Sequence, residues 1–164
     1  MFELYKHFQF EAGHQLPNHK GKCRRPHGHS YKLTIKLRSS SLHSNGSNQN
    51  MVMDFADLSA IVEHMIDTYL DHHWLNDTLN CEAPTAEIIA QWIYRHLKPQ
   101  LPQLIEVNLN ETASAGVRYW EPETRVATQT LPRTYCSGSD ASVGVEDKGL
   151  PLAKTHTLAD RSLQ

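Results

Sequence analysis

The sequence predicts an α+β domain, in which an antiparallel four-stranded sheet carries two helices on one face. Residues near both ends of the first 121 positions alternate between apolar and polar, the pattern of half-buried strands. Two stretches between them place apolar residues at helical spacing. The resulting order, β-β-α-α-β-β, groups strands with strands and helices with helices, and this favours an antiparallel sheet covered on one side.

The first two strands are expected at residues 2–12 and 29–38, where alternation is clearest. Residues 16–26 between them form a loop with several basic side chains. Residues 39–50 are rich in Ser, Asn and Gly and predict a connection without periodic structure. Residues 51–53 are expected to resume as a short strand.

Asp54 is the expected N-cap of a helix that runs to about Leu70. A second helix is expected after Pro84, with Thr85 as its cap, and Pro99 ends it. Strands are predicted again near residues 105–111 and 115–121. The apolar positions of the first helix follow one buried face: Phe55, Leu58, Ile61, Val62, Met65, Ile66 and Tyr69.

We expect residues 1–121 to form the catalytic domain and residues 122–164 a C-terminal tail that is disordered or loosely docked. Thr, Ser, Gly and Asp dominate the tail as far as Gly149, and its apolar residues follow no period. The four predicted strands leave open sheet edges. Assembly of several copies into a homo-oligomer would cover them.

Composition excludes several classes of partner. The chain has 164 residues, a net charge of -2 and a pI near 6.6, so it lacks the basic character of proteins that bind nucleic acid or anionic membranes. It shows no signal segment and no apolar run of about 18 residues. Three cysteines without a CxxC pair do not form a disulfide framework. We therefore expect a cytoplasmic protein.

A histidine pair begins the second predicted strand. His27 and His29 are separated by one glycine, so both side chains lie on the same face. His14 ends the first strand, on the side that also carries Phe10 and Ala12. Three imidazoles on one ion leave a fourth position open, as in catalytic zinc sites. The alternative is that these are ordinary histidines, hydrogen-bonded within the core.

Cys23 lies four residues before His27, next to two arginines. As a thiolate, which a nearby metal ion and those arginines would favour, it could act as a base or nucleophile. It could also be an ordinary loop cysteine, or a fourth ligand that closes a structural site.

Two carboxylates complete the candidate residues. Asp71 precedes His72 and could orient or charge that imidazole for proton transfer, although His73 is nearly as well placed and a histidine here could simply cap the helix. Glu111 shares the parity of apolar residues on its strand. It either reaches water or binds a heterocycle with adjacent N–H donors, as in pterins.

Together these motifs resemble the 6-pyruvoyl-tetrahydropterin synthase family, and within it the bacterial 6-carboxytetrahydropterin synthases of queuosine biosynthesis. The resemblance covers about residues 3–121. The short spacer between Cys23 and His27 favours the carboxy-forming branch over the pyruvoyl-forming one. The matching motifs are Phe10-Glu11-Ala12-Gly13-His14, Cys23-Arg24-Arg25-Pro26-His27-Gly28-His29, Met53-Asp54-Phe55, Leu70-Asp71-His72-His73, Pro84-Thr85-Ala86-Glu87 and Glu111-Thr112.

The resemblance implies the tunnelling fold, trimers or hexamers with active sites between subunits, and a pterin triphosphate substrate. It implies Zn²⁺ as cofactor, and residue roles that follow the motifs. The metal ligands would be His14, His27 and His29. Cys23 would be the base, Asp71 with His72 its acid/base partner, and Glu111 the anchor of the pterin ring. A metal- or pterin-binding module without activity is the competing hypothesis.

Overall fold

Four antiparallel strands form one sheet in the computed structural model, which describes residues 1–122. Their order in the sheet is the order in the chain, so every pairing joins neighbours in sequence. The predicted tail, residues 122–164, lies outside the described residues except for Pro122. The strands are β1 (Phe2–His14), β2 (His27–Ser39), β3 (Leu104–Asn110) and β4 (Gly116–Tyr119).

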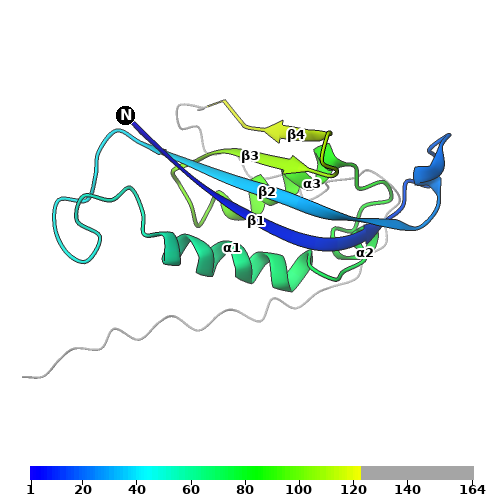
Figure 1. Ribbon diagram of the computed structural model, residues 1–164, viewed down its shortest axis with the longest axis horizontal. Helices are drawn as coiled ribbons and strands as arrows, with labels where there is room; N and C mark the ends of the chain where they lie inside the picture. Colours follow the sequence, from blue (N-terminus) through cyan, green and yellow to red (C-terminus); the bar gives the residue numbers. More distant parts are fainter. Residues whose placement is uncertain (123–164) are drawn as a thin grey trace, which may run out of the picture.

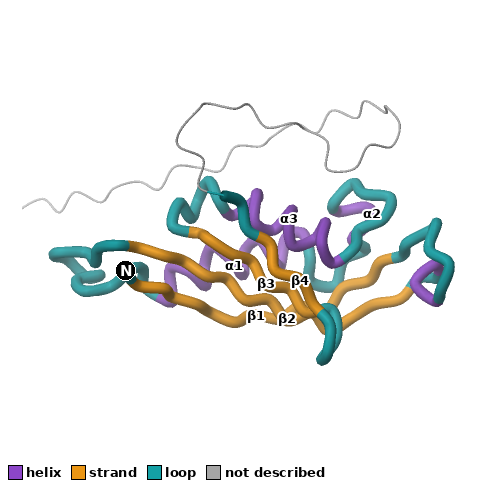
Figure 2. Tube along the Cα trace, turned by 90° about the horizontal axis from the view of Figure 1, so that it is seen from above, coloured by secondary structure: helices purple, strands orange, loops and turns teal. Residues whose placement is uncertain are grey.

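Two helices lie on one face of this sheet, as the sequence predicts (Figure 1, Figure 2). Helix α1 (Phe55–Tyr69) lies beside β1, and α3 (Ala86–Leu97) packs against β3 and β4. A one-turn helix, α2 (Leu75–Thr78), and a 3-10 turn, η1 (Lys22–Arg24), complete the elements. Among residues 1–122, no helix is long and apolar enough to cross a membrane.

Strand alternation decides which side chains face the helices. Phe10 and Ala12 of β1 are buried, as are Leu33 and Ile35 of β2, whereas the residues between them are partly or fully exposed. The register places His14 directly opposite His27 at the end of the β1–β2 pair. The same parity that builds the core therefore carries histidines onto the helix-facing side.

The predicted helix starts are correct. The side chain of Asp54 accepts a hydrogen bond of 2.6 Å from the Ala56 amide, as an N-cap should. Thr85 occupies the N-cap position of α3, although its side chain makes no capping bond.

Two local predictions were wrong or incomplete. Residues 51–53 do not form a strand, because Met51 bonds only within its loop: its carbonyl accepts from the His43 amide and its amide donates to Asn48. Helix α2 was not predicted, since a single turn has no periodicity to detect. The first two strands are also longer than expected, and both reach the histidines.

Candidate active site

Three imidazoles converge where β1 ends and β2 begins. One ring nitrogen from each of His14, His27 and His29 lies within 4.8 Å of the other two. Their Nε2 atoms are all buried, and none has a hydrogen-bond partner within residues 1–122. Buried polar atoms are normally bonded, so three unpartnered nitrogens that face one another indicate a site for a cation.

Backbone carbonyls orient two of these rings. The Nδ1 atom of His14 lies 2.8 Å from the Pro84 carbonyl oxygen, and that of His27 lies 2.7 Å from the Arg25 carbonyl oxygen. Because a carbonyl only accepts, each Nδ1 carries the proton and donates it. Each Nε2 then keeps its lone pair free, the arrangement that metal-ligating histidines use.

Burial keeps His14 in the neutral form that a metal ion requires. The side chain is fully buried, and loss of solvation lowers the pKa of its imidazole, while the hydrogen bond to Pro84 opposes this effect. Neutral imidazole is a zinc ligand, and three such nitrogens match the donor set of a catalytic zinc centre. The residues therefore fit the implied cofactor.

Glu111 faces the same cluster from the end of β3. Its Oε1 atom lies 3.4 Å from Nε2 of His14 and 3.4 Å from Nε2 of His29. About a quarter of its side chain is exposed, so the carboxylate has not escaped into water.

Tyr31 lies beside the cluster, its ring centroid 5.5 Å from that of His29. Burial raises the pKa of the Tyr31 phenol, and the charge of Glu111 adds to the increase.

The Asp71–His72 pair is held against the outer edge of β1. His72 donates from Nδ1 to Asp71 at 2.7 Å, and Asp71 accepts from the Glu11 amide at 2.8 Å. The His72 amide donates in turn to the Glu11 carbonyl. The hydrogen bond from Glu11 is the main reason that the pKa of the Asp71 carboxyl lies below its ordinary value.

Asp71 is hydrogen-bonded to His72 and not to His73, two residues that sequence spacing could not separate. His72 has a φ of 58°, in the left-handed region, and this conformation turns the chain directly after α1. His73 contributes its backbone instead: its carbonyl accepts from the Gly13 amide. The side chain of His72 is 79% exposed, so its second nitrogen is accessible to a small molecule.

A hollow of about 520 Å³ is lined by some residues of each group. His27 and His29 line it from the sheet, and His72 lines it from the segment beside β1. Glu11 and Ser30 lie across from each other on β1 and β2 and also line it, joined by a hydrogen bond of 2.8 Å. The hollow therefore has two of the three clustered histidines and the imidazole bonded to Asp71 on its walls.

Cys23 is not part of the metal-ligand cluster. It lies in η1, is partly exposed, and is a free cysteine. Its carbonyl accepts from the Leu16 amide at 2.9 Å, which folds the loop back on itself. Within one chain, the structure thus joins the three histidines and Glu111, and separately Asp71 with His72, but it does not place Cys23 among either group.

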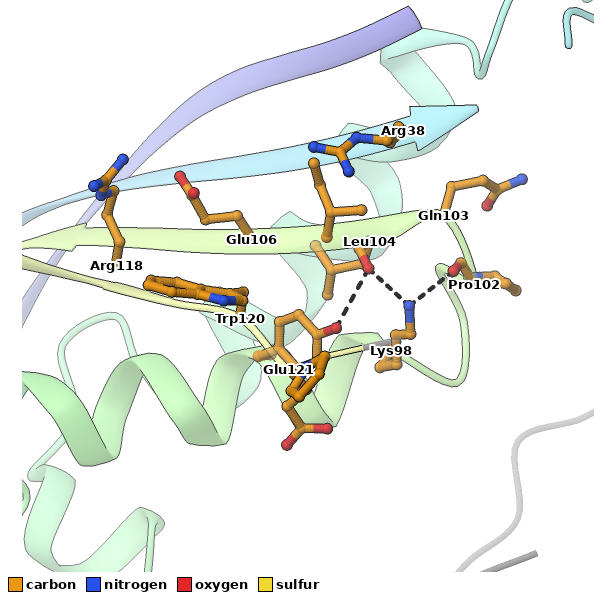
Figure 3. A pocket seen from close by; sticks show the side chains of 12 residues that line it. Arg38, Lys98, Pro102, Gln103, Leu104, Glu106, Arg118, Trp120 and Glu121 are labelled. Atoms are coloured by element: carbon orange, nitrogen blue, oxygen red, sulfur yellow. Dashed lines mark hydrogen bonds between the residues drawn. The ribbon is translucent and has the colours of Figure 1, made fainter. Parts of the chain in front are cut away.

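A larger hollow, of about 900 Å³, lies at the opposite end of the sheet, and none of the predicted site residues lines it (Figure 3). Its cationic side chains are mostly engaged. Lys98 donates to the carbonyls of Pro102 and Leu104, and Arg38 pairs with Glu3. The smaller hollow is therefore the candidate active site.

Several supporting groups were missed by sequence reasoning. The carbonyls of Pro84 and Arg25 and the backbone of Glu11 act through main-chain atoms, which carry no residue-type signal. One signal was available: Gly13 and Gly28 lie opposite each other in the register. A Cβ at Gly28 would lie 2.8 Å from the Ala12 carbonyl oxygen. Glycine within a strand often marks such a close approach.

Comparison with known proteins identifies the family. Residues 3–122 match the 6-pyruvoyl tetrahydropterin synthase family. The chain belongs to this family. One relative, from Synechocystis sp., is named 6-carboxy-5,6,7,8-tetrahydropterin synthase and is 46% identical over 123 residues, which cover 74% of this chain and 95% of the relative. A relative of the same name from Haemophilus influenzae is 31% identical and covers 76% of this chain and 95% of its own length.

Solved structures in the family share the fold. The 6-pyruvoyl tetrahydropterin synthase of Caenorhabditis elegans superposes with a TM-score of 0.64 at 24% identity, over 74% of this chain and 96% of the other. The enzyme of the same name from Plasmodium vivax gives 0.55 at 21% identity, over 72% and 96%. The predicted family and fold class are both confirmed.

Proposed function

We propose that this chain converts 7,8-dihydroneopterin triphosphate and water to 6-carboxy-5,6,7,8-tetrahydropterin, acetaldehyde and triphosphate, a step toward queuosine. One observation carries the proposal: three imidazole nitrogens without a hydrogen-bond partner meet at the end of the sheet, and two of their rings share a hollow with His72, which is bonded to Asp71. The chain is also 46% identical to a protein named for that product. A protein that only binds a metal or a pterin would need the three histidines but not the Asp71–His72 pair.

In this proposal His14, His27 and His29 hold a zinc ion. When bound, zinc supplies Lewis-acid activation of the substrate side chain. The ligands are prepared for this role, because backbone carbonyls fix the protonated nitrogens of His14 and His27. Three protein ligands would leave a fourth position on the ion for a substrate oxygen.

Proton transfer falls to Cys23, Asp71 and His72. We assign Cys23 the role of base that removes a proton from the substrate side chain, and His72 the role of its partner. Asp71 keeps the His72 ring in the tautomer with Nδ1 protonated, so the other ring nitrogen can accept or return a proton. Cys23 lies apart from this pair in one chain, so the proposal includes an active site completed by a neighbouring copy in a cytoplasmic homo-oligomer.

Glu111 is assigned to binding rather than proton transfer. A carboxylate can accept two parallel hydrogen bonds from the adjacent N–H donors of a pterin ring. Its Oε1 atom lies 3.4 Å from Nε2 of His14 and from Nε2 of His29, so a ring bound by this carboxylate would lie beside the histidine cluster.

The test incubates zinc-loaded protein with dihydroneopterin triphosphate and identifies the products by mass. Carboxy product with acetaldehyde supports the proposal. Pyruvoyl product without acetaldehyde would assign the chain to the other branch of the family. Substrate binding without turnover would make the protein a pterin-binding module.

A further inference from the structure

Positive charge is concentrated on one part of this chain. No Asp or Glu occurs between Glu11 and Asp54, although the protein as a whole has a net charge of -2. Two of the cations in that stretch are neutralised across the sheet, Lys36 by Glu106 and Arg38 by Glu3. Four more lie close together in the β1–β2 loop: Lys20, Lys22, Arg24 and Arg25.

These four side chains are all exposed, and none forms an ion pair with a described residue. One acid that contacts the loop, Glu82, accepts a hydrogen bond from Asn18 rather than pairing with a cation. A solvated protein surface usually mixes charges of both signs. Here four positive charges lie within six residues without an acid among them, and a bound anion would offset their mutual repulsion.

Hydrogen bonds hold the backbone of the loop that carries these cations. The Leu16 amide donates to the Cys23 carbonyl, and the Arg25 amide donates to the Lys22 carbonyl at 3.0 Å. The second bond closes the 3-10 turn η1. Because residues three apart eclipse in such a turn, Lys22 and Arg25 lie on the same side of it.

The loop leads directly into the candidate active site. The Arg25 carbonyl accepts the hydrogen bond that orients His27, so the basic residues begin at the edge of the metal-ligand cluster. Figures 1 and 2 show the loop projecting past the end of the sheet, beyond the strands that carry the histidines. A substrate whose reacting carbon lies at the histidines could extend its far end along this loop.

We propose that Lys22 and Arg25, with Lys20 and Arg24 beside them, bind the triphosphate chain of the substrate. This inference rests on the proposed function. A triphosphate carries several negative charges and many acceptor oxygens, which suit the forked guanidinium of arginine and the point charge of lysine. The same contacts would stabilise triphosphate as the leaving group.

The direct test is binding of inorganic triphosphate, measured by calorimetry with zinc-loaded and with chelator-treated protein. We expect binding in both states, weakened by added salt. A Lys22→Gln/Arg25→Gln variant should bind at least about tenfold more weakly, the effect of losing charge-assisted contacts. The matched control is Lys32→Gln/Arg118→Gln, which removes two exposed cations from the sheet. Its affinity should equal that of the unchanged protein.

Turnover separates this inference from the proposed function. If the protein is active, the loop variant should raise KM with little change in kcat when product release is not limiting. Loop-dependent triphosphate binding without turnover would refute the reaction and keep the anion site. Turnover with equal triphosphate affinity in the loop variant and its control would refute the anion site and keep the reaction. Binding that vanishes with chelator would assign the anion to the metal instead.

Discussion

Tyr31→Phe should stabilise this protein, although it alters a fully buried residue beside the metal-ligand cluster. The Tyr31 hydroxyl has no hydrogen-bond partner within the described residues, and the side chain is 0% exposed. An unsatisfied buried hydroxyl costs about 1–3 kcal/mol. Phenylalanine removes that cost and keeps the ring, which stacks on Phe10 at a centroid distance of 4.9 Å.

We expect a gain of about 1 kcal/mol in the free energy of unfolding, the lower end of that range. In urea, where the slope for a small protein is about 2 kcal/mol per molar, the midpoint should rise by about 0.5 M without a change in slope. Metal-free protein should be used, so that binding does not contribute. Tyr94→Phe is the matched control, because the hydroxyl of that buried tyrosine donates to the Leu104 carbonyl. It should lose stability.

The dependence of the free energy of unfolding on alkaline pH gives a second measurement on the same variant. Burial raises the pKa of Tyr31 above its ordinary value, so the unfolded chain ionises first, near pH 10. Unchanged protein therefore loses stability as the pH rises above about 10, and Tyr31→Phe should lack that part of the loss. A lower urea midpoint for Tyr31→Phe at neutral pH would show that the hydroxyl is bonded, and would refute the reasoning.

Three further predictions concern the site and the helix layer. Cys23→Ala should keep its zinc, measured by metal analysis, while kcat falls by about 10²–10⁴; loss of zinc would make Cys23 a ligand. Asp71→Asn should lower kcat by about 10². The Asp71 carboxylate has a lowered pKa, so it stabilises the folded protein above about pH 4, and this contribution is lost as the pH falls further. Asp71→Asn should lack this contribution, which urea midpoints measured at pH 3 to 6 would show. Burial and His64 lower the pKa of His96, so unchanged protein should lose stability as the pH falls below about 6.5, and His96→Phe should flatten that dependence in thermal unfolding. An unaltered pH dependence in His96→Phe would contradict the assignment.

The metal-ligand set could be predicted from sequence because its geometry is local. Strand alternation alone places His27 and His29 on one face, and the same rule carries His14 to the apolar side of its own strand. Only the pairing of the two strands had to be assumed. The structure confirms this convergence, while the catalytic roles stay predictions.

The Asp71–His72 arrangement shows where sequence reasoning ends. Their adjacency was visible, but the groups that hold them, the amide and carbonyl of Glu11, lie 60 residues away in sequence. Nothing in a residue's identity reveals a main-chain contact of that range. The short strand predicted at residues 51–53 failed for a related reason, because an apolar run becomes a strand only where a sheet edge is available to pair with it.

The segment that presents His72 also occupies part of β1's free edge. The His72 amide bonds the Glu11 carbonyl, and the Gly13 amide bonds the His73 carbonyl. A neighbouring chain that added a strand to β1 could form backbone hydrogen bonds with it only as far as about Phe10. Strand pairing between two copies along β1 would therefore have to end before the segment that carries Asp71 and His72. The residues proposed to transfer protons would thus also limit the length of that contact.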